Sequence, residues 1–275
     1  MKYFDAHTHV QFVSYGDEQG AVMERARDAG VGMNLVGTQY ETSLEAVQMA
    51  EKYADVWATI GLHPTHTSHS SPDTNELGVL ADEFTKHGEI FDAAQYKQLA
   101  QSSKVIAIGE CGLDYFRLES DTKKLQQDIF IQQIEMANEL NKPLMLHIRS
   151  TPKAADTYTD ALEILRTHTK VLGDVHFFAG DWEVAKRFLD IGFTLSFTGV
   201  ITFTHDYDEV IRNTPLDMIL SETDAPYVTP TPFRGKRNEP FYIPHIVKKI
   251  ANIRGQDEEL VTTQLRSNIT RLFGV

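Results

Sequence analysis

Short apolar, β-prone runs alternate with amphipathic helical stretches along the whole chain, and this alternation restricts the possible folds more than any other feature. The runs that predict strands are residues 2–6, 33–36, 56–60, 104–108, 143–146, 171–175, 193–196 and 217–220. The clearest helical stretches are residues 20–29, 42–53, 121–140, 153–168, 182–190, 207–213, 241–253 and 257–273. We therefore expect an α/β fold, a (β/α)8 TIM barrel, formed by a single domain over residues 1–275.

A doubly wound open sheet is the alternative fold for such an alternation. That fold usually has fewer strands and a glycine-rich phosphate-binding turn after the first one. The first predicted strand is not followed by a G-x-G-x-x-G motif, so the barrel is favoured.

Charge and cysteine content narrow the class of protein. A net charge of −13, from 26 basic and 39 acidic residues, argues against a positively coated protein that grips long duplex DNA. A small basic pocket is still compatible with it. Cys111 is the only cysteine, so an intrachain disulfide is excluded and a reducing compartment is favoured. Because we find no leader-like segment and no apolar run of membrane-spanning length, we expect a cytoplasmic protein without membrane contact.

Polar residues follow the predicted strands, at the face where barrel enzymes hold their catalytic groups. They lie in "DAHTH" (Asp5, His7, His9), "GLHP" (His63), "GECGLDY" (Glu110, Asp114), "LHIR" (His147, Arg149), "VHFFAG" (His176) and "SETDAPY" (Glu222, Asp224). One histidine after a strand is more often a capping or packed residue than a ligand. So many at one face predict a metal site, and a polar layer without metal is less favoured because buried unpaired groups are costly.

The opening motif predicts the first half of that site. Side chains alternate along a strand, so His7 and His9 point the same way and can bind one cation together with Asp224. Asp5 has the same parity but lies deeper, so we expect it behind an imidazole, holding its tautomer. Imidazole and carboxylate ligands suit zinc, manganese, iron or nickel, and carboxylates also accept magnesium.

The remaining ligands predict a second cation. His147 and His176 can hold it, and Glu110 can bridge both ions. Two divalent cations generate a nucleophile from water and stabilise a leaving oxygen, and Asp224 can take the proton from that water. The expected reaction is a metal-assisted hydrolysis in which Glu110 and Asp224 are catalytic. Cys111 is expected in the core rather than as a nucleophile.

Taken together, these motifs resemble the TatD family of metal-dependent hydrolases, within the amidohydrolase superfamily. The resemblance runs from "DAHTH" to "RGKRNEP"; the H-x-H is common to the superfamily, whereas "GECGLDY" and "ETDAPY" followed by "RGKRNEP" are more specific. It implies a TIM barrel and a divalent-metal site. The ligands that it implies are His7, His9, Glu110, His147, His176 and Asp224.

The resemblance also implies an activity. The family is associated with deoxyribonucleases, including 3′-to-5′ trimming of single-stranded DNA, and some members are linked to removal of D-amino acids from tRNA. Two features depart from the family pattern. Phe177 and Ala179 in "HFFAG" replace the more usual residues of "HCFSG", and the segment 65–103 is about a dozen residues longer than usual. That segment is either an insertion with additional helix or a lid over the site.

Cations beyond the ligands suit an anionic substrate. "TPFRGKRNEP" supplies Arg234, Lys236 and Arg237 after the last strand, and Arg149 follows the ligand His147 by two residues. A solvated surface is the alternative role for the loop cations. For Arg149 the alternative is a salt bridge to Glu222 or Asp114 that orients the site, and this gives Glu222 a supporting role behind the ligands.

Three further residues are candidates for substrate contact. His63 can contact the substrate or donate a proton. Tyr115 and Tyr227, each just past a ligand motif, can stack on a base, although packing is the more frequent role of such aromatic residues.

The sequence therefore favours a nuclease that acts on DNA ends or short single strands, because the net charge disfavours long duplex binding. The alternatives are a D-aminoacyl-tRNA deacylase or another ester or amide hydrolase on the same site, and a non-catalytic metal-binding protein. Phosphotriesterase-like and lactonase-like relatives more often use a carboxylated lysine at the end of strand four, where this chain has Glu110. DNA is the expected partner, tRNA a possible one, and the chain is expected to be a monomer.

Overall fold

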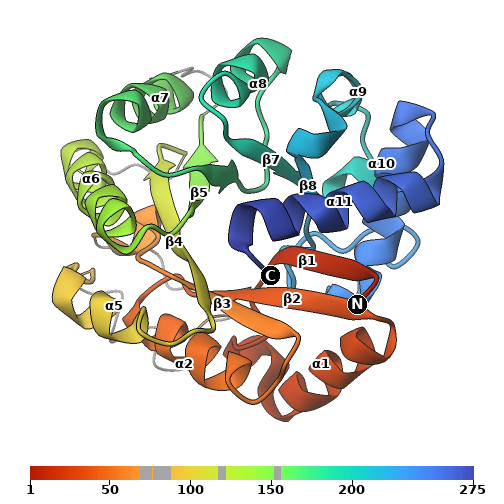
Figure 1. Ribbon diagram of the computed structural model, residues 1–275, viewed down its shortest axis with the longest axis horizontal. Helices are drawn as coiled ribbons and strands as arrows, with labels where there is room; N and C mark the ends of the chain where they lie inside the picture. Colours follow the sequence, from red (N-terminus) through yellow and green to blue (C-terminus); the bar gives the residue numbers. More distant parts are fainter. Residues whose placement is uncertain (69–75, 77–87, 117–121, 152–155) are drawn as a thin grey trace.

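The computed structural model describes residues 1–68, 76, 88–116, 122–151 and 156–275. Its eight strands are all parallel and form one sheet in the order of the chain, with helices packed around them (Figure 1). The strands are β1 (Tyr3–Thr8), β2 (Val31–Val36), β3 (Val56–Ile60), β4 (Val105–Asp114), β5 (Leu144–Arg149), β6 (Gly173–Val175), β7 (Thr194–Phe197) and β8 (Ile219–Ser221). The predicted (β/α)8 architecture is confirmed.

The helices of the outer layer follow the strands, as the sequence predicts. The α-helices in the described residues are α1 (Gln19–Asp28), α2 (Tyr40–Ala50), α5 (Ala93–Leu99), α6 (Lys123–Leu140), α7 (Asp156–His168), α8 (Trp182–Leu189), α9 (Asp208–Asn213), α10 (Ile243–Arg254) and α11 (Glu258–Phe273). Local signals set their ends. Gly255 adopts a left-handed conformation after α10, and Asp257 accepts hydrogen bonds from two backbone N–H groups at the start of α11.

The segment after β8 closes the barrel against β1. Thr8 forms a parallel bridge with Ala225, and the backbone N–H of His9 donates to the carbonyl of Ala225 at 2.8 Å. The N–H of Asp224 donates to the carbonyl of His7 at 2.9 Å. Backbone bonds at the seam therefore join the first and the last ligand motif directly.

β4 is longer than the sequence predicts. The predicted strand ends at residue 108, whereas the observed strand continues to Asp114. The reason is pairing with β5, in which residues 112–114 lie opposite residues 147–149. Glycine and acidic residues have low strand propensity, so only pairing with β5 reveals this extension. The "GECGLD" motif is consequently strand, and its side chains are held rigidly.

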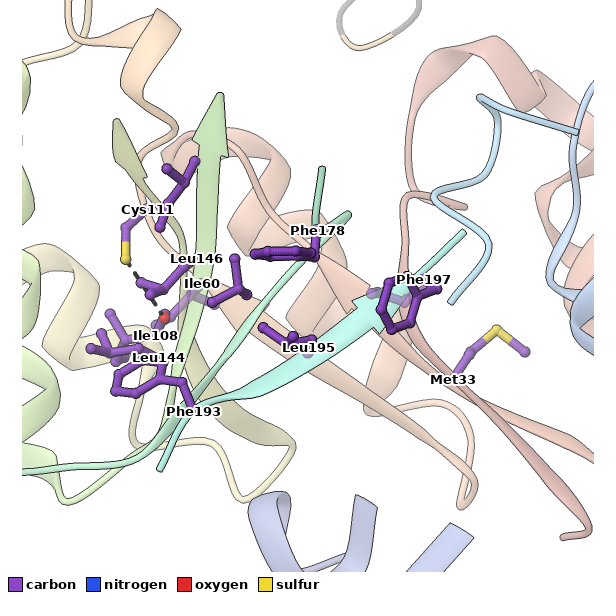
Figure 2. Close-up of a cluster of buried hydrophobic side chains, with 14 of the residues drawn as sticks. Met33, Ile60, Ile108, Cys111, Leu144, Leu146, Phe178, Phe193, Leu195 and Phe197 are labelled. Atoms are coloured by element: carbon purple, nitrogen blue, oxygen red, sulfur yellow. Dashed lines mark hydrogen bonds between the residues drawn. The ribbon is translucent and has the colours of Figure 1, made fainter. Parts of the chain in front are cut away.

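The apolar core lies largely between the sheet and its helices, and Figure 2 shows part of it. Leu144 and Leu146 of β5 pack there with Leu195 of β7 and with Phe193. Cys111 belongs to the same cluster, with Sγ 3.8 Å from the carbonyl oxygen of Met145. Burial raises the pKa of its thiol, so Cys111 is a packed residue, as expected, and no nucleophile.

Some expectations concern residues outside the described part of the chain. Of the segment 65–103, in which a lid or an insertion is expected, residues 69–75 and 77–87 lie outside the described part, and the predicted helices 121–140 and 153–168 begin in such residues. Between those two gaps Glu76 is described, and its carboxylate lies 2.8 Å from Nε2 of His66. Nowhere in the described ranges does a helix combine the length and the apolar character that crossing a membrane requires.

Candidate metal centre

Two glycines determine where Glu110 points. The pairing of β4 with β5 shifts register between Ile108 and Cys111, and such an irregularity re-aims a side chain. Gly109 and Gly112 have φ of +153° and +139°. A Cβ would lie 2.3 Å from a backbone oxygen of β5 at Gly109 and 2.1 Å from one at Gly112. The glycines in "GECG" therefore permit the close approach that brings Glu110 into the barrel mouth.

His7, His9 and Asp224 form one group of donors. The Nε2 atoms of the two imidazoles are 3.1 Å apart, and Nε2 of His9 is 3.4 Å from Oδ1 of Asp224. Nδ1 of His9 lies 2.7 Å from the carbonyl oxygen of Val36, which can only accept a hydrogen bond. His9 therefore carries its proton on Nδ1 and presents the lone pair of Nε2 to the site, as a metal ligand does.

The backbone of Asp224 is also constrained. Its φ of +52° is unusual for a residue other than glycine. The bond of its N–H to the carbonyl of His7 holds this conformation at the barrel seam. Backbone strain of this kind is concentrated at functional sites.

Glu110 is the centre of the second group. Its carboxylate oxygens lie 2.9 Å from His147, 3.4 Å from His7, 3.5 Å from His63 and 3.7 Å from His176. Side chains from β1, β4, β5 and the segments after β3 and β6 thus meet at one carboxylate. This arrangement supports the bridging position proposed for Glu110.

Two carboxylates stand behind the imidazoles. Glu222 lies 3.0 Å from Nδ1 of His176 and accepts a hydrogen bond from the N–H of Phe177 at 2.7 Å. Asp114 lies 3.1 Å from Nε2 of His147. The sequence predicts the supporting role of Glu222 but indicates no role of its own for Asp114. Its position four residues after Glu110 on one strand was the available signal, because such residues share a face.

His63 also lies deeper in the site than a substrate contact requires. Its ring centroid is 4.2 Å from that of His147, and Nδ1 accepts a hydrogen bond from the N–H of Thr65 at 3.2 Å. His63, Glu110 and His147 form one of the groups able to hold a cation. His63 is thus a further candidate ligand, or a proton donor beside Glu110.

Asp5 occupies a different position from the expected one. It accepts hydrogen bonds from the N–H of Thr223 at 2.8 Å and from its hydroxyl at 2.5 Å, and from the N–H of His7 at 3.3 Å. None of the hydrogen bonds of the described residues joins it to an imidazole. The register of β1 shifts between Asp5 and Thr8, so strict alternation does not extend from Asp5 to the histidines. Asp5 therefore fastens β1 to the segment after β8.

The electrostatics of the centre are those of a site built for cations. Burial alone would raise the pKa of Glu110, but the surrounding His63, His7 and His147 hold it well below its usual range. Burial, together with the neighbouring His176, lowers the pKa of His7 to about 4. Glu110 is therefore an ionised carboxylate and His7 a neutral imidazole, the forms that bind metals.

His147 and His176 differ from His7 in their protonation. Burial lowers the pKa of each, but carboxylates outweigh it: Asp114 and Glu110 raise that of His147 to about 9, and Glu222 raises that of His176 to about 10. A cation must displace these protons when it binds. The donors fit divalent metal, since His7, His9 and Asp224 form one group with all ligand atoms within 4.8 Å, as do His63, Glu110 and His147.

Tyr115 is not placed to stack on a base. Its side chain is only 6% exposed, and its hydroxyl donates to Asp160 at 2.8 Å and accepts from Gln127 at 3.0 Å. Lys123 lies over its ring. Tyr115 packs in the core, and this is a correction to the predicted stacking role. Tyr227 is only partly buried, and its ring lies edge-on to that of His9 at 6.4 Å.

The cations of the rim have separate roles. Arg237 donates to the carbonyl of Ser14 at 3.0 Å and pairs with Glu18, so it anchors the segment after β1. Arg149 and Arg234 are exposed, and each guanidinium lies over a phenylalanine ring. The salt bridge of Arg149 to Glu222 or Asp114 is absent from the ion pairs of the described residues.

Comparisons with known proteins give the family of the chain. A family model described as TatD related DNase matches residues 4–274. An uncharacterized metal-dependent hydrolase of Bacillus subtilis, YabD, is 35% identical over 277 residues, 99% of each chain. The 3′-5′ ssDNA/RNA exonuclease TatD of Pantoea ananatis is 33% identical over 283 residues, again 99% of each chain.

The fold comparison gives the same result. The crystal structure of YJJV, a TatD homolog from Escherichia coli K12, superimposes with a TM-score of 0.82 at 27% identity, covering 100% of this chain and 98% of that one. Family match, sequence identity and fold all extend over essentially the whole chain. The chain therefore belongs to the TatD family of metal-dependent hydrolases.

Proposed function

We propose that this chain is a nuclease that hydrolyses phosphodiester bonds at the 3′ ends of single-stranded DNA with two divalent cations. The observation that carries the proposal is the convergence of imidazole and carboxylate donors on Glu110, at the open end of the barrel. His7, His9 and Asp224 would hold one cation, His147 and His176 the other, and Glu110 would lie between them. When bound, such a pair activates water and offsets charge on the leaving oxygen.

The chain's own residues supply the remaining functions. Glu222 orients His176 and Asp114 orients His147, so both imidazoles are fixed before substrate arrives. Asp224 is ionised, because His9 holds its pKa below the ordinary value against the effect of burial. It is therefore available to accept the proton of the attacking water.

Two cation–aromatic pairs on the rim favour a nucleic-acid substrate. The guanidinium of Arg149 lies 4.2 Å from the ring centroid of Phe116, and that of Arg234 lies 3.9 Å from that of Phe203. These residues follow or end strands β4, β5, β7 and β8, so they share the face of the metal centre. Phe116 and Phe203 are 47% and 44% exposed. Exposed rings beside cations suit the bases and phosphates of a single strand.

The overall charge is consistent with this choice of substrate. At −13 the protein repels long nucleic acid at a distance. Two separated arginines at the mouth can still bind the few phosphates of an end. A 3′ end entering the barrel mouth therefore fits better than duplex lying across the surface.

The test compares substrates on metal-loaded protein. We expect hydrolysis of 3′-labelled single-stranded DNA with Mg²⁺ or Mn²⁺, and little cleavage of closed circular duplex. Turnover of D-aminoacyl-tRNA without cleavage of DNA would overturn the proposal in favour of a deacylase. Equal cleavage of circular duplex and free ends would overturn the preference for ends.

Variants of the rim test the choice of substrate. Arg149→Ala and Arg234→Ala should each raise KM for a short oligonucleotide by about tenfold or more, because a hydrogen bond to a charged group contributes about 1.5–3 kcal/mol. Neither should change KM for bis(p-nitrophenyl) phosphate, which has no bases or second phosphate. Arg212→Ala is the matched control, since Arg212 is exposed in the last turn of α9, away from the mouth. Equal effects of all three variants would contradict the assignment.

A further inference from the structure

A line of buried polar side chains leads through the barrel interior to His176. Thr194 donates to Oδ1 of Asp174 at 2.6 Å. Oγ of Ser196 lies 2.6 Å from Oδ2 of Asp174 and 2.8 Å from Oε2 of Glu222. The other oxygen of Glu222 is the one 3.0 Å from His176. Asp174, Ser196 and Glu222 are all 0% exposed, so solvent supplies none of these bonds.

The hydroxyl of Ser196 links the carboxyl groups of Asp174 and Glu222. Ser196 has one hydroxyl proton but two carboxyl oxygens within hydrogen-bond distance, and only one of them can accept it. Because the hydroxyl is buried, a change in either carboxyl group alters the hydrogen bond that the serine can make to the other.

We infer that Asp174 is a positioning residue: through Ser196 it fixes Glu222 behind His176 and so determines how well His176 holds a divalent cation. The inference rests on the proposed metal centre. Without Asp174, the hydroxyl of Ser196 can turn to its alternative acceptor, the carbonyl of Val175 at 3.4 Å. Oε2 of Glu222 would then lose its donor, and the carboxylate could rotate away from His176.

The position of Asp174 in the barrel supports this role. It lies on β6, two residues before His176, and one layer further from the mouth. Bulky branched apolar residues normally dominate such interior layers. A fully buried carboxyl group in such a layer lowers the stability of the fold, so its link to Glu222 accounts for its presence.

The experiment measures Zn²⁺ affinity by isothermal titration of the metal-free full-length protein. Ser196→Ala and Asp174→Leu should each weaken binding at one site by about tenfold or more, as loss of a residue that orients a ligand does. Asp174→Asn should stay within about twofold of the natural protein. Its amide can still hydrogen-bond to Ser196 and Thr194, which leucine cannot, so this rescue separates a positioning role from simple packing.

Asn34→Leu is the matched control. Asn34 of β2 is also fully buried, and it donates to the carbonyl of Ala6 at 3.0 Å and to Thr59 at 2.8 Å, with no hydrogen bond to a candidate ligand side chain among the described residues. This variant should lower Tm and leave Zn²⁺ affinity unchanged. Unchanged affinity in Ser196→Ala, or equal losses in Asp174→Asn and Asp174→Leu, would overturn the inference alone. A natural chain that binds no Zn²⁺ would overturn the metal centre as well.

Discussion

Gly112→Ala tests whether the glycines of β4 place the metal centre. The new Cβ would lie 2.1 Å from the carbonyl oxygen of His147, and real Cβ atoms essentially never come closer than 3.0 Å. The two strands must therefore separate by about 0.9 Å at a position where backbone, not a flexible side chain, is the obstacle. The residue displaced is itself a candidate ligand.

The expected cost follows from two contributions. Overpacking of this kind costs about 1–3 kcal/mol, and a φ of +139° strains any residue with a side chain by about 1–3 kcal/mol. Replacing glycine also stabilises by about 0.4–1 kcal/mol through the unfolded chain. A net loss of about 3 kcal/mol corresponds to a Tm lower by about 6–12 °C for a chain of this size. A displacement of nearly 1 Å at a reacting centre lowers kcat by about 100-fold.

Thermal unfolding and steady-state hydrolysis measure the two effects, with Gly20→Ala as the control. Gly20 lies in α1 with nothing within 4 Å of an added Cβ, so its substitution should raise Tm slightly and leave kcat unchanged. If Gly112→Ala had the stability and activity of the control, close packing of β4 on β5 would not be what positions the site.

Three other substitutions have expected outcomes. Glu110→Gln should keep the fold by circular dichroism but lose metal-dependent turnover and about half of the bound metal. The reason is that five imidazoles lie within 4.0 Å of the Glu110 carboxylate, which is therefore central to the site. Activity retained by this variant would contradict the bridging role. Glu76→Gln should lower Tm at about pH 5.5 and have little effect at about pH 9. Burial opposes both charges of the pair, but Glu76 raises the pKa of His66 and His66 lowers that of Glu76. The pair thus stabilises the folded protein above the ordinary pKa of Glu76, 4.5, and its contribution is lost as the pH rises through the raised pKa of His66. An effect of Glu76→Gln on Tm that grew with pH would contradict this role of the pair. Tyr115→Phe should cost about 1 kcal/mol through the lost bond to Asp160 and leave the oligonucleotide KM unchanged, whereas a raised KM would restore the stacking role.

Local pattern was sufficient to predict the architecture and most residues of the candidate metal centre. Apolar runs and amphipathic stretches are short-range features, so the order of eight strands could be predicted from them. Because parallel strands in a barrel end at one face, each motif then needed only to follow its strand for His7, His147 and Asp224 to be expected together.

Pairing between strands decided what alternation alone could not. A register shift in β1 separates Asp5 from the histidines, and a second one in β4 turns Glu110 into the mouth. Such irregularities depend on the neighbouring strand, so a period of two along one segment does not reveal them. Likewise, the hydroxyl of Tyr115 donates a hydrogen bond to Asp160, which is 45 residues away in the sequence.

By itself, the sequence determined that the chain forms a barrel and which residue types gather at its open end, because both follow from the order of residues along each segment. Only the tertiary structure determined which of those residues touch. Asp174 lies on β6, Ser196 on β7 and Glu222 directly after β8, and nothing in any one segment reveals the bonds that link them. The physical reason is that burial makes a hydrogen bond obligatory without specifying its partner, and the partner is set by the packing of distant strands.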